Sequence, residues 1–305
     1  MLVIKRFSEL SFNEAISLWN ESWKHYFSDM TMDLNRFLQK VTGEGISLEN
    51  SVVAVYEGKL AGFVLNSFRT INGKQYVWNG GTAIAPDFRG MGIGKKLIAV
   101  CLEIYKEQNV DIARLEAIKE NETAIKLYKK MGYQTFEELA FMQHEGEISV
   151  FNGLGSNVAV KNATMQEIKA LSFFEPLTAW QTQFQSLKDF SCAMAMDGEK
   201  PVGYVVYKKG YKETGELAGI VLYQCAIDPE YHQEEEATAN LINIAFSPEE
   251  GAVRRLTMNV PKKNNAINRL LNEAGFTKFV EQVHMERPIK KEMETQAAKT
   301  FSEID

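Results

Sequence analysis

Cysteine and histidine are both scarce in this sequence of 305 residues, and neither is grouped. The three cysteines (Cys101, Cys192 and Cys225) and the four histidines lie far apart, with none of the spacings typical of zinc sites or disulfide frameworks. We therefore expect no bound metal. Unpaired thiols favour a reducing compartment, the cytoplasm.

Long apolar segments are missing as well. The sequence has no run of about 18 apolar residues that could cross a bilayer. The N-terminal stretch MLVIKRFSEL lacks the apolar core and the small-residue cleavage site of a signal peptide. The sequence thus predicts no membrane association.

Basic residues are outnumbered, since 34 Lys and Arg stand against 40 Asp and Glu, for a formal net charge of −6. This balance argues against a general nucleic-acid-binding protein. A hydrophobic content of 45% excludes a disordered chain. At roughly 100–200 residues per domain, the length leaves room for two domains.

The first half of the chain alternates strand and helix patterns. Apolar residues at helical spacing predict helices near residues 12–23 and over 93–108. Short apolar or alternating runs predict strands at 2–4, 52–56, 60–68, 76–85 and 112–118. Asn121 is placed to cap a further helix that ends at Gly132, and one or two strands in 133–144 are expected to close the sheet.

The second half repeats this order. Three landmarks recur at one offset of 143 residues: Pro86 and Pro229, Asn121 and Asn264, Gly132 and Gly275. A period this long excludes a solenoid and indicates a duplicated domain. The segment 146–157, rich in Gly, Asn and Ser, marks the boundary. We expect one domain over 1–147, a second over 157–288 and a polar tail over 289–305.

The most informative segment follows the strand 76–85 and opens a helix with the sequence Arg89-Gly90-Met91-Gly92-Ile93-Gly94-Lys95. The glycines let backbone N–H groups approach a ligand, and the helix N-terminus and two cationic side chains add positive charge. Together these features favour a phosphate or pyrophosphate. A glycine-rich turn without a ligand stays open as the alternative.

Two common phosphate-binding loops are excluded by spacing. A P-loop requires glycine where Arg89 stands and Ser or Thr where Lys96 stands. A dinucleotide fingerprint that starts at Gly90 requires its third glycine at the position of Lys95. An oxidoreductase or a P-loop kinase is therefore not favoured.

The pattern Arg89-x-x-Gly92-x-Gly94 after a strand resembles the acyl-CoA pyrophosphate loop of the GNAT acetyltransferases. A second motif is similar to that family's helix after the fifth strand and comprises Asn121, Ala124, Leu127, Tyr128, Gly132 and Tyr133. The resemblance covers residues 1–145. It implies an α/β (α+β) fold with two tandem acyl-CoA N-acyltransferase-like domains. Each would be a twisted mixed sheet with splayed central strands flanked by helices.

The resemblance also implies a co-substrate, acetyl-CoA, in the gap between the strands 76–85 and 112–118. The cofactor-binding residues would be Ala83, Ile84 and Ala85 for the pantetheine amides, Arg89, Gly90, Met91, Gly92, Ile93, Gly94 and Lys95 for the pyrophosphate, and Asn121. The pair Gly80-Gly81 fits the need for a bulge in the first of the two strands.

In this family an amine attacks the thioester, and an acid protonates the departing CoA thiolate. Tyr128 is the candidate acid by its motif position, on the same helix face as Asn121 seven residues earlier. A half-buried tyrosine without a catalytic role is the alternative. Glu116 is the candidate base, directly or through water, but it could be a solvated carboxylate, and an amine of suitable pKa would need no base.

The acceptor is poorly specified. Trp19, Trp23, Tyr26, Phe27 and Trp78 could line its pocket or belong to the core, and His25 could contact it or lie on the surface. The expected partner is an amine of a small molecule or a peptide, not a nucleic acid. The oligomeric state stays open.

The second copy lacks the residues of the first. Shifted by 143 positions, Arg89, Gly92, Gly94 and Tyr128 become His232, Glu235, Ala237 and Leu271. Each of the three glutamates 234–236 would repel a phosphate by about 1 kcal/mol at about 4 Å even in bulk water. The sequence predicts an N-acetyltransferase with one active domain and one degenerate domain. A non-catalytic acyl-CoA-binding or regulatory module is the alternative.

Overall fold

The computed structural model describes residues 1–151 and 158–289. Contacts divide the described residues into two compact units, one formed by Met1–Phe136 with residues 284–289 and the other by Glu137–Val283. We call them unit 1 and unit 2. The tail predicted at 289–305 lies outside the described residues except for Ile289, and so does part of the predicted boundary segment.

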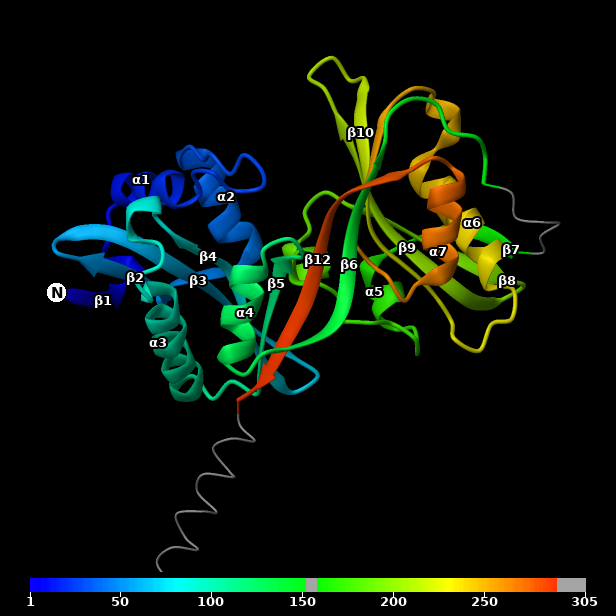
Figure 1. Ribbon diagram of the computed structural model, residues 1–305. Coiled ribbons are helices and arrows are strands. Elements are labelled where there is room, and N and C mark those ends of the chain that lie inside the picture. The colour runs from blue at the N-terminus through cyan, green and yellow to red at the C-terminus, as the bar shows by residue number, and fades with distance from the viewer. Residues whose placement is uncertain (152–157, 290–305) are drawn as a thin grey trace, which may run out of the picture. The chain divides into compact units, whose positions relative to one another are not determined.

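Unit 1 contains most of the expected elements in the expected order (Figure 1). The helices and strands of unit 1 are β1 (Leu2–Arg6), α1 (Phe12–Ser22), α2 (Leu34–Glu44), β2 (Ile46–Tyr56), β3 (Lys59–Ile71), β4 (Lys74–Ile84), α3 (Ile93–Glu107), β5 (Ile112–Ile118) and α4 (Glu122–Lys130). Short 3-10 turns follow β1 (Phe7–Glu9) and β4 (Pro86–Phe88). The helix α2 was not predicted.

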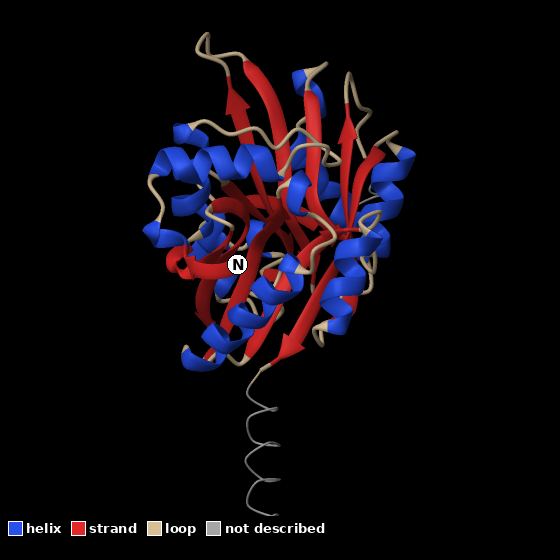
Figure 2. Cartoon of the chain, turned by 60° about the vertical axis from the view of Figure 1, so that its left-hand side comes forward, coloured by secondary structure: helices blue, strands red, loops and turns tan. Residues whose placement is uncertain are grey.

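The sheet of unit 1 has the order β1-β2-β3-β4-β5. Neighbouring strands are antiparallel except β4 and β5, which are parallel, so the sheet is mixed as expected. Phe63 and Leu65 of β3 pack with α1 and α2, whereas Asn66 contacts α3 by hydrogen bonds with Cys101 and Tyr105. Because side chains alternate along a strand, the helices cover opposite faces, as Figures 1 and 2 show.

The strands β4 and β5 separate after a short parallel contact. Their pairing runs only from Tyr76 and Ile112 to Asn79 and Leu115, although both strands continue beyond it. The register of β4 against β3 shifts at Gly80, which is the expected bulge. An added Cβ at Gly80 would lie 2.4 Å from the ring of Trp78, so this position accepts only glycine.

The far end of the chain completes the sheet of unit 1. The strand β12 (Thr277–Pro288) neighbours β5, and its last residues run antiparallel to that strand. Ile289 N–H donates to the carbonyl of Asp111, and Glu286 forms an ion pair with Arg114. Residues 284–288 thus belong to unit 1, although the sequence placed them in the second domain.

The strand β6 (Gln134–His144) is the opposite case, since it was expected in the first domain and most of it belongs to unit 2. The sequence assigned residues 133–144 to the closure of the first sheet, but those from Glu137 onward belong to unit 2. There they pair antiparallel with β11, with His144 opposite Arg255. Sequence periodicity predicted the strand correctly and its sheet incorrectly, because periodicity reports which face is apolar and not which partner is hydrogen-bonded.

Unit 2 repeats the plan with fewer helices. Its further elements are β7 (Val158–Ala163), α5 (Met165–Lys169), β8 (Ser191–Asp197), β9 (Lys200–Tyr211), β10 (Leu217–Ile227), α6 (Glu234–Phe246), β11 (Arg254–Pro261) and α7 (Asn265–Glu273). The sheet order is β6-β11-β10-β9-β8-β7. Short 3-10 turns at Trp180–Thr182 and Phe184–Ser186 stand where a counterpart of α2 would lie.

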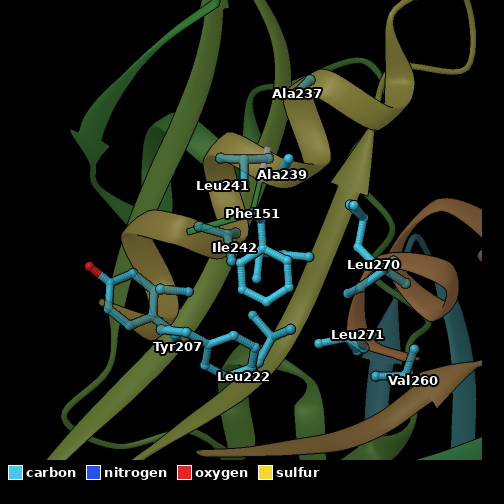
Figure 3. Packing of buried hydrophobic residues seen from close by; sticks show 14 of the residues in the cluster. Phe151, Tyr207, Leu222, Ala237, Ala239, Leu241, Ile242, Val260, Leu270 and Leu271 are labelled. Atoms are coloured by element: carbon cyan, nitrogen blue, oxygen red, sulfur yellow. The ribbon is translucent and has the colours of Figure 1, made fainter. Parts of the chain in front are cut away.

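The core of unit 2 is packed from α6, α7 and the adjoining strands. Small residues such as Ala237 and Ala239 let α6 lie close to the sheet, and both are fully buried. Figure 3 shows Leu270 and Leu271 of α7 directed toward this cluster. Unit 2 has the same strand separation, since β10 and β11 pair only from Gly219 to Leu222.

The pairing of β12 with β5 gives a stability prediction. Two N–H groups of Arg114 lie 3.2 and 2.9 Å from one carboxylate oxygen of Glu286. Because hydrogen bonds to charged groups contribute about 1.5–3 kcal/mol, Glu286→Ala should lower the unfolding free energy of unit 1 by about that amount. Differential scanning calorimetry should show a lower unfolding temperature. The control Glu281→Ala, which removes the exposed pair with Lys278, should shift stability by no more than about 0.5 kcal/mol, and equal shifts would contradict the prediction.

Candidate active site

A cavity of about 790 Å³ lies in unit 1 at the end of β4. Its walls are the last residues of β4, the loop that leads into α3, the α4 helix and the segment after α1. Of the predicted site residues, it brings together Ala83, Ile84, Arg89, Gly90, Gly92, Ile93, Gly94, Lys95, Asn121 and Tyr128. Ala85, Met91 and Glu116 are not among its lining residues.

The glycine loop opens α3 without a side-chain cap. Gly92 is the N-cap residue and receives no side-chain hydrogen bond, so the first N–H groups of the helix lack an intramolecular partner of that kind. Gly90 and Gly92 have φ angles of +80° and +75°, in the left-handed region that side chains disfavour. This local geometry suits an anion at the helix N-terminus.

The cavity is lined by three lysines. Lys95 comes from the first turn of α3, and Lys126 and Lys130 come from α4. Sequence reasoning missed the two on α4, although their separation of four residues places them on one helix face. Lys126 also pairs with Glu122 at 2.6 Å, an exposed contact that leaves the ammonium group available to other anions.

Arg89 contacts protein carbonyls. Its Nε donates to the carbonyl of Ile84 at 3.0 Å, and one Nη donates to the carbonyls of Ser22 and Lys24 at 3.1 and 2.9 Å. The side chain therefore joins the glycine loop to the end of α1. Met91 points elsewhere and is 45% exposed.

The edge of β4 offers different backbone groups from those expected. Ala85 N–H donates to Ala61 on β3, and its carbonyl accepts the N–H of Phe88. Because hydrogen-bonding directions alternate in an antiparallel pair, Ala83 also turns toward β3, whereas Thr82 and Ile84 turn their backbone groups the other way. The sequence analysis missed Thr82, because the sequence alone does not show which backbone groups of β4 face β3.

Tyr128 is the buried end of the cavity and is 6% exposed. Burial raises the pKa of its hydroxyl to about 12, and a hydrogen bond with Thr82 opposes this shift. Tyr26 lies nearby, its pKa is also raised by burial, and it is hydrogen-bonded to Asn121. Asn121 caps α4 by accepting the N–H of Ala124 at 3.2 Å. Tyr128 therefore keeps its proton at neutral pH.

Glu116 lies on β5 and makes buried contacts. One carboxylate oxygen accepts the indole N–H of Trp78 at 2.5 Å, and the other lies 3.4 Å from Nε2 of His284. The side chains of Glu116 and His284 are only 6% and 2% exposed, so the carboxylate is not a solvated one. Sequence reasoning missed His284 because it lies 168 positions from Glu116 and reaches it only through the pairing of β12 with β5.

The aromatic residues divide between core and cavity. Trp19 and Trp78 are 1% and 3% exposed and do not line the cavity. Trp23, Tyr26 and Phe27 do line it, and so does His25. The helix α1 thus places Trp19 in the core, and the segment after the helix turns Trp23, Tyr26 and Phe27 toward the cavity.

The matching region of unit 2 has the opposite charge. A cavity of about 940 Å³ is lined by Glu234, Glu235 and Glu236 at the start of α6, and by Glu273 and Arg269 of α7. Arg269 pairs with Glu235. Leu271, the counterpart of Tyr128, is fully buried in the apolar cluster.

Residues 1–151 and 158–289 contain neither a metal-type cluster of side chains nor a membrane-spanning helix. No three His, Cys, Asp or Glu side chains are arranged there to hold a metal ion. No helix in those ranges combines the length and apolar character needed to span a bilayer.

Known proteins with similar sequences or structures agree with this geometry. Residues 12–133 match the family described as the acetyltransferase (GNAT) family. An uncharacterized N-acetyltransferase from Dictyostelium discoideum is 32% identical over 66 residues, which is 22% of this chain and 31% of that protein. The match thus spans about a third of the length of this relative.

Two solved structures resemble the whole chain. A GCN5-related N-acetyltransferase from Sphaerobacter thermophilus has a TM-score of 0.66 at 15% identity, over 94% of this chain and 96% of the other. A tandem GNAT protein from the clavulanic acid biosynthesis pathway has a TM-score of 0.62 at 10% identity, over 95% and 99%. At these identities the likeness shows the fold. Residues 12–133 thus carry the sequence pattern of the GNAT family, and the chain as a whole has the fold of a tandem GNAT protein.

Proposed function

We propose that unit 1 transfers an acetyl group from acetyl-CoA to an amine of a small molecule or a peptide. One observation carries the proposal: a single cavity joins an uncapped helix N-terminus to a buried, protonated tyrosine. The first feature suits the pyrophosphate of CoA, and the second suits a thiolate leaving group. The cavity would therefore hold both the pyrophosphate and the thioester group of one acetyl-CoA molecule.

The backbone of unit 1 would bind the co-substrate in two regions, the glycine loop and the end of β4. The N–H groups of Gly92, Ile93 and Gly94 would hold the pyrophosphate, with Lys95, Lys126 and Lys130 supplying charge. The outward-facing backbone groups of Thr82 and Ile84 would bind the pantetheine amides, which would take the place of the missing strand partner. Ala83 would line the cavity through its side chain, and Ala85 would support the strand through Ala61.

The reaction needs one nucleophile and one acid. The amine nitrogen attacks the thioester carbonyl carbon, and the carbon–sulfur bond breaks as the tetrahedral intermediate collapses. Tyr128 gives its proton to the sulfur and regains one from solvent. A thiolate that departs into a buried site is a stronger base than in water, because desolvation disfavours its charge, and it therefore takes the proton of Tyr128 more readily.

The amine must also lose a proton. Glu116 would accept it through an intervening water, because the carboxylate does not line the cavity. His284 lies 3.4 Å from the other oxygen and would hold the carboxylate in place. This assignment gives the last strand of the chain a role in the chemistry of unit 1.

Acetyl-CoA binding tests the proposal directly. Isothermal titration should give one binding site per chain, because the carboxylates of Glu234, Glu235 and Glu236 repel phosphate in unit 2. Gly92→Ala should weaken binding at least about tenfold, since alanine disfavours the φ of +75°. The control Gly43→Ala adds a methyl group in open space on α2 and should leave affinity unchanged. Two sites per chain, or none, would contradict the proposal.

Tyr128→Phe tests the acid. It should lower kcat by about 100-fold or more while CoA affinity stays within about twofold, because only the proton donor is removed. Since the pKa of Tyr128 is raised to about 12, the wild-type enzyme should show no loss of activity from this group up to about pH 10. The exposed Tyr211→Phe in unit 2 is the matched control. Unchanged turnover of Tyr128→Phe would remove the acid from the mechanism, and CoA binding without turnover in the wild type would favour a binding module.

Glu116→Gln tests the base through the shape of the pH profile. With the carboxylate present, the enzyme should use protonated amine, and kcat/KM should level off below the pKa of the acceptor. Without it, only amine that is already neutral reacts, so kcat/KM should keep rising until the acceptor's own pKa. Initial rates between about pH 6 and 10 measure this difference. Identical profiles for the two enzymes would show that Glu116 takes no proton.

A further inference from the structure

The guanidinium of Arg89 donates hydrogen bonds to backbone carbonyls at the end of β4 and at the end of α1. The three carbonyls that it contacts are those of Ile84, Ser22 and Lys24, at 3.0, 3.1 and 2.9 Å. Ser22 is the last residue of α1, and Lys24 lies just beyond the helix end. One side chain of the glycine loop therefore reaches across to the opposite wall of the cavity.

This contact satisfies the carbonyl of Ser22 at the end of α1 and that of Lys24 just beyond it. The last carbonyls of an α-helix have no intrahelical donor, and a cation near them is favourable because the helix C-terminus carries partial negative charge. The helix α1 itself contains no basic residue that could supply this charge. Arg89 thus caps α1 from a distant part of the chain.

The segment held in this way forms the aromatic wall of the cavity. Trp23, His25, Tyr26 and Phe27 all line it, and Tyr26 contacts Asn121. His25 has a φ of +62°, an uncommon conformation for a residue with a side chain, which persists only when its surroundings hold it. The carbonyl bond to Lys24, directly before His25, is one such restraint.

We propose that Arg89 is a positioning residue for the acceptor side of the site and not a ligand of the pyrophosphate. It fixes residues 22–27 against the glycine loop, so the loop that meets the co-substrate also sets the wall that meets the amine. This inference rests on the proposed function for its kinetic consequences. Its structural part stands on the three carbonyl bonds alone.

Three variants separate positioning from phosphate binding. Arg89→Gln removes the guanidinium, Arg89→Lys keeps the charge but offers one donor group, and Lys95→Gln removes a cation that makes no such carbonyl contacts. Arg254→Gln, at an exposed arginine of unit 2, is the matched control. Each is compared with the wild type in the full-length chain.

The first measurement is tryptic cleavage after Lys24, followed by mass spectrometry. The Lys24 side chain is 56% exposed, so cleavage reports how often its backbone opens. Arg89→Gln should speed this cleavage at least tenfold, Arg89→Lys should restore part of the protection, and Lys95→Gln and Arg254→Gln should not change it. A rate for Arg89→Gln within twofold of the wild type would overturn the positioning role.

The second measurement is affinity and turnover. Isothermal titration with CoA should show Arg89→Gln within threefold of the wild type and Lys95→Gln at least tenfold weaker. Steady-state kinetics, with the best acceptor from a panel of polyamines, amino acids and peptides, should show a KM for the amine raised at least tenfold and a KM for acetyl-CoA raised less than threefold. CoA binding weakened as much by Arg89→Gln as by Lys95→Gln would make Arg89 a phosphate ligand. A wild type that binds no CoA would instead refute the proposed function, while the cleavage result still decides the positioning role.

Discussion

The separation of β4 and β5 is the constraint on which unit 1 depends. Their parallel pairing ends at Asn79 and Leu115, so each strand continues with one edge that has no strand opposite it. Unpaired backbone groups are costly when buried, and a structure keeps them only where water or a ligand can satisfy them. The cavity at the end of β4 is where this need is met, and the bulge at Gly80 turns the strand away to create it.

The opposite edge of β5 has to be satisfied by the protein itself. Residues 284–289, the last that the structure describes, supply that partner, and they bring Glu286 to Arg114 and His284 to Glu116. The buried carboxylate of Glu116 is thereby tied to the strand β12. The exchange of β6 and β12 between the units means that neither half of the sequence contains a complete sheet, which explains why the compact units do not follow the boundary expected near residues 146–157.

Local sequence signals predicted most of the fold and many of the residues that line the cavity. Helical spacing, Asn121 as a cap and the glycines of the loop act within a few residues, so 93–108 and 112–118 agree closely with α3 and β5. The helix α2 does carry apolar residues at helical spacing, Leu34, Phe37, Leu38 and Val41, and the sequence analysis missed this stripe. The sequence analysis did not identify Thr82 and His284, because their roles depend on strand register and on pairing between distant segments, which periodicity does not encode. The expected domain ranges and site roles stay predictions.

The two units show how little of this fold depends on its chemistry. Unit 2 keeps the strand separation, the bulge at the matching position and a helix after it, although carboxylates replace the glycine loop and Leu271 replaces Tyr128. The separation of strands is therefore a property of backbone pairing and can persist without a phosphate site. In unit 2 the first turn of α6 already carries three glutamates, whose charges complement the positive end of the helix and remove its need for an external anion. In unit 1 the corresponding helix end is left without such charges, and this difference, set by a few residues in the first turn, is what favours a bound anion in one unit and opposes it in the other.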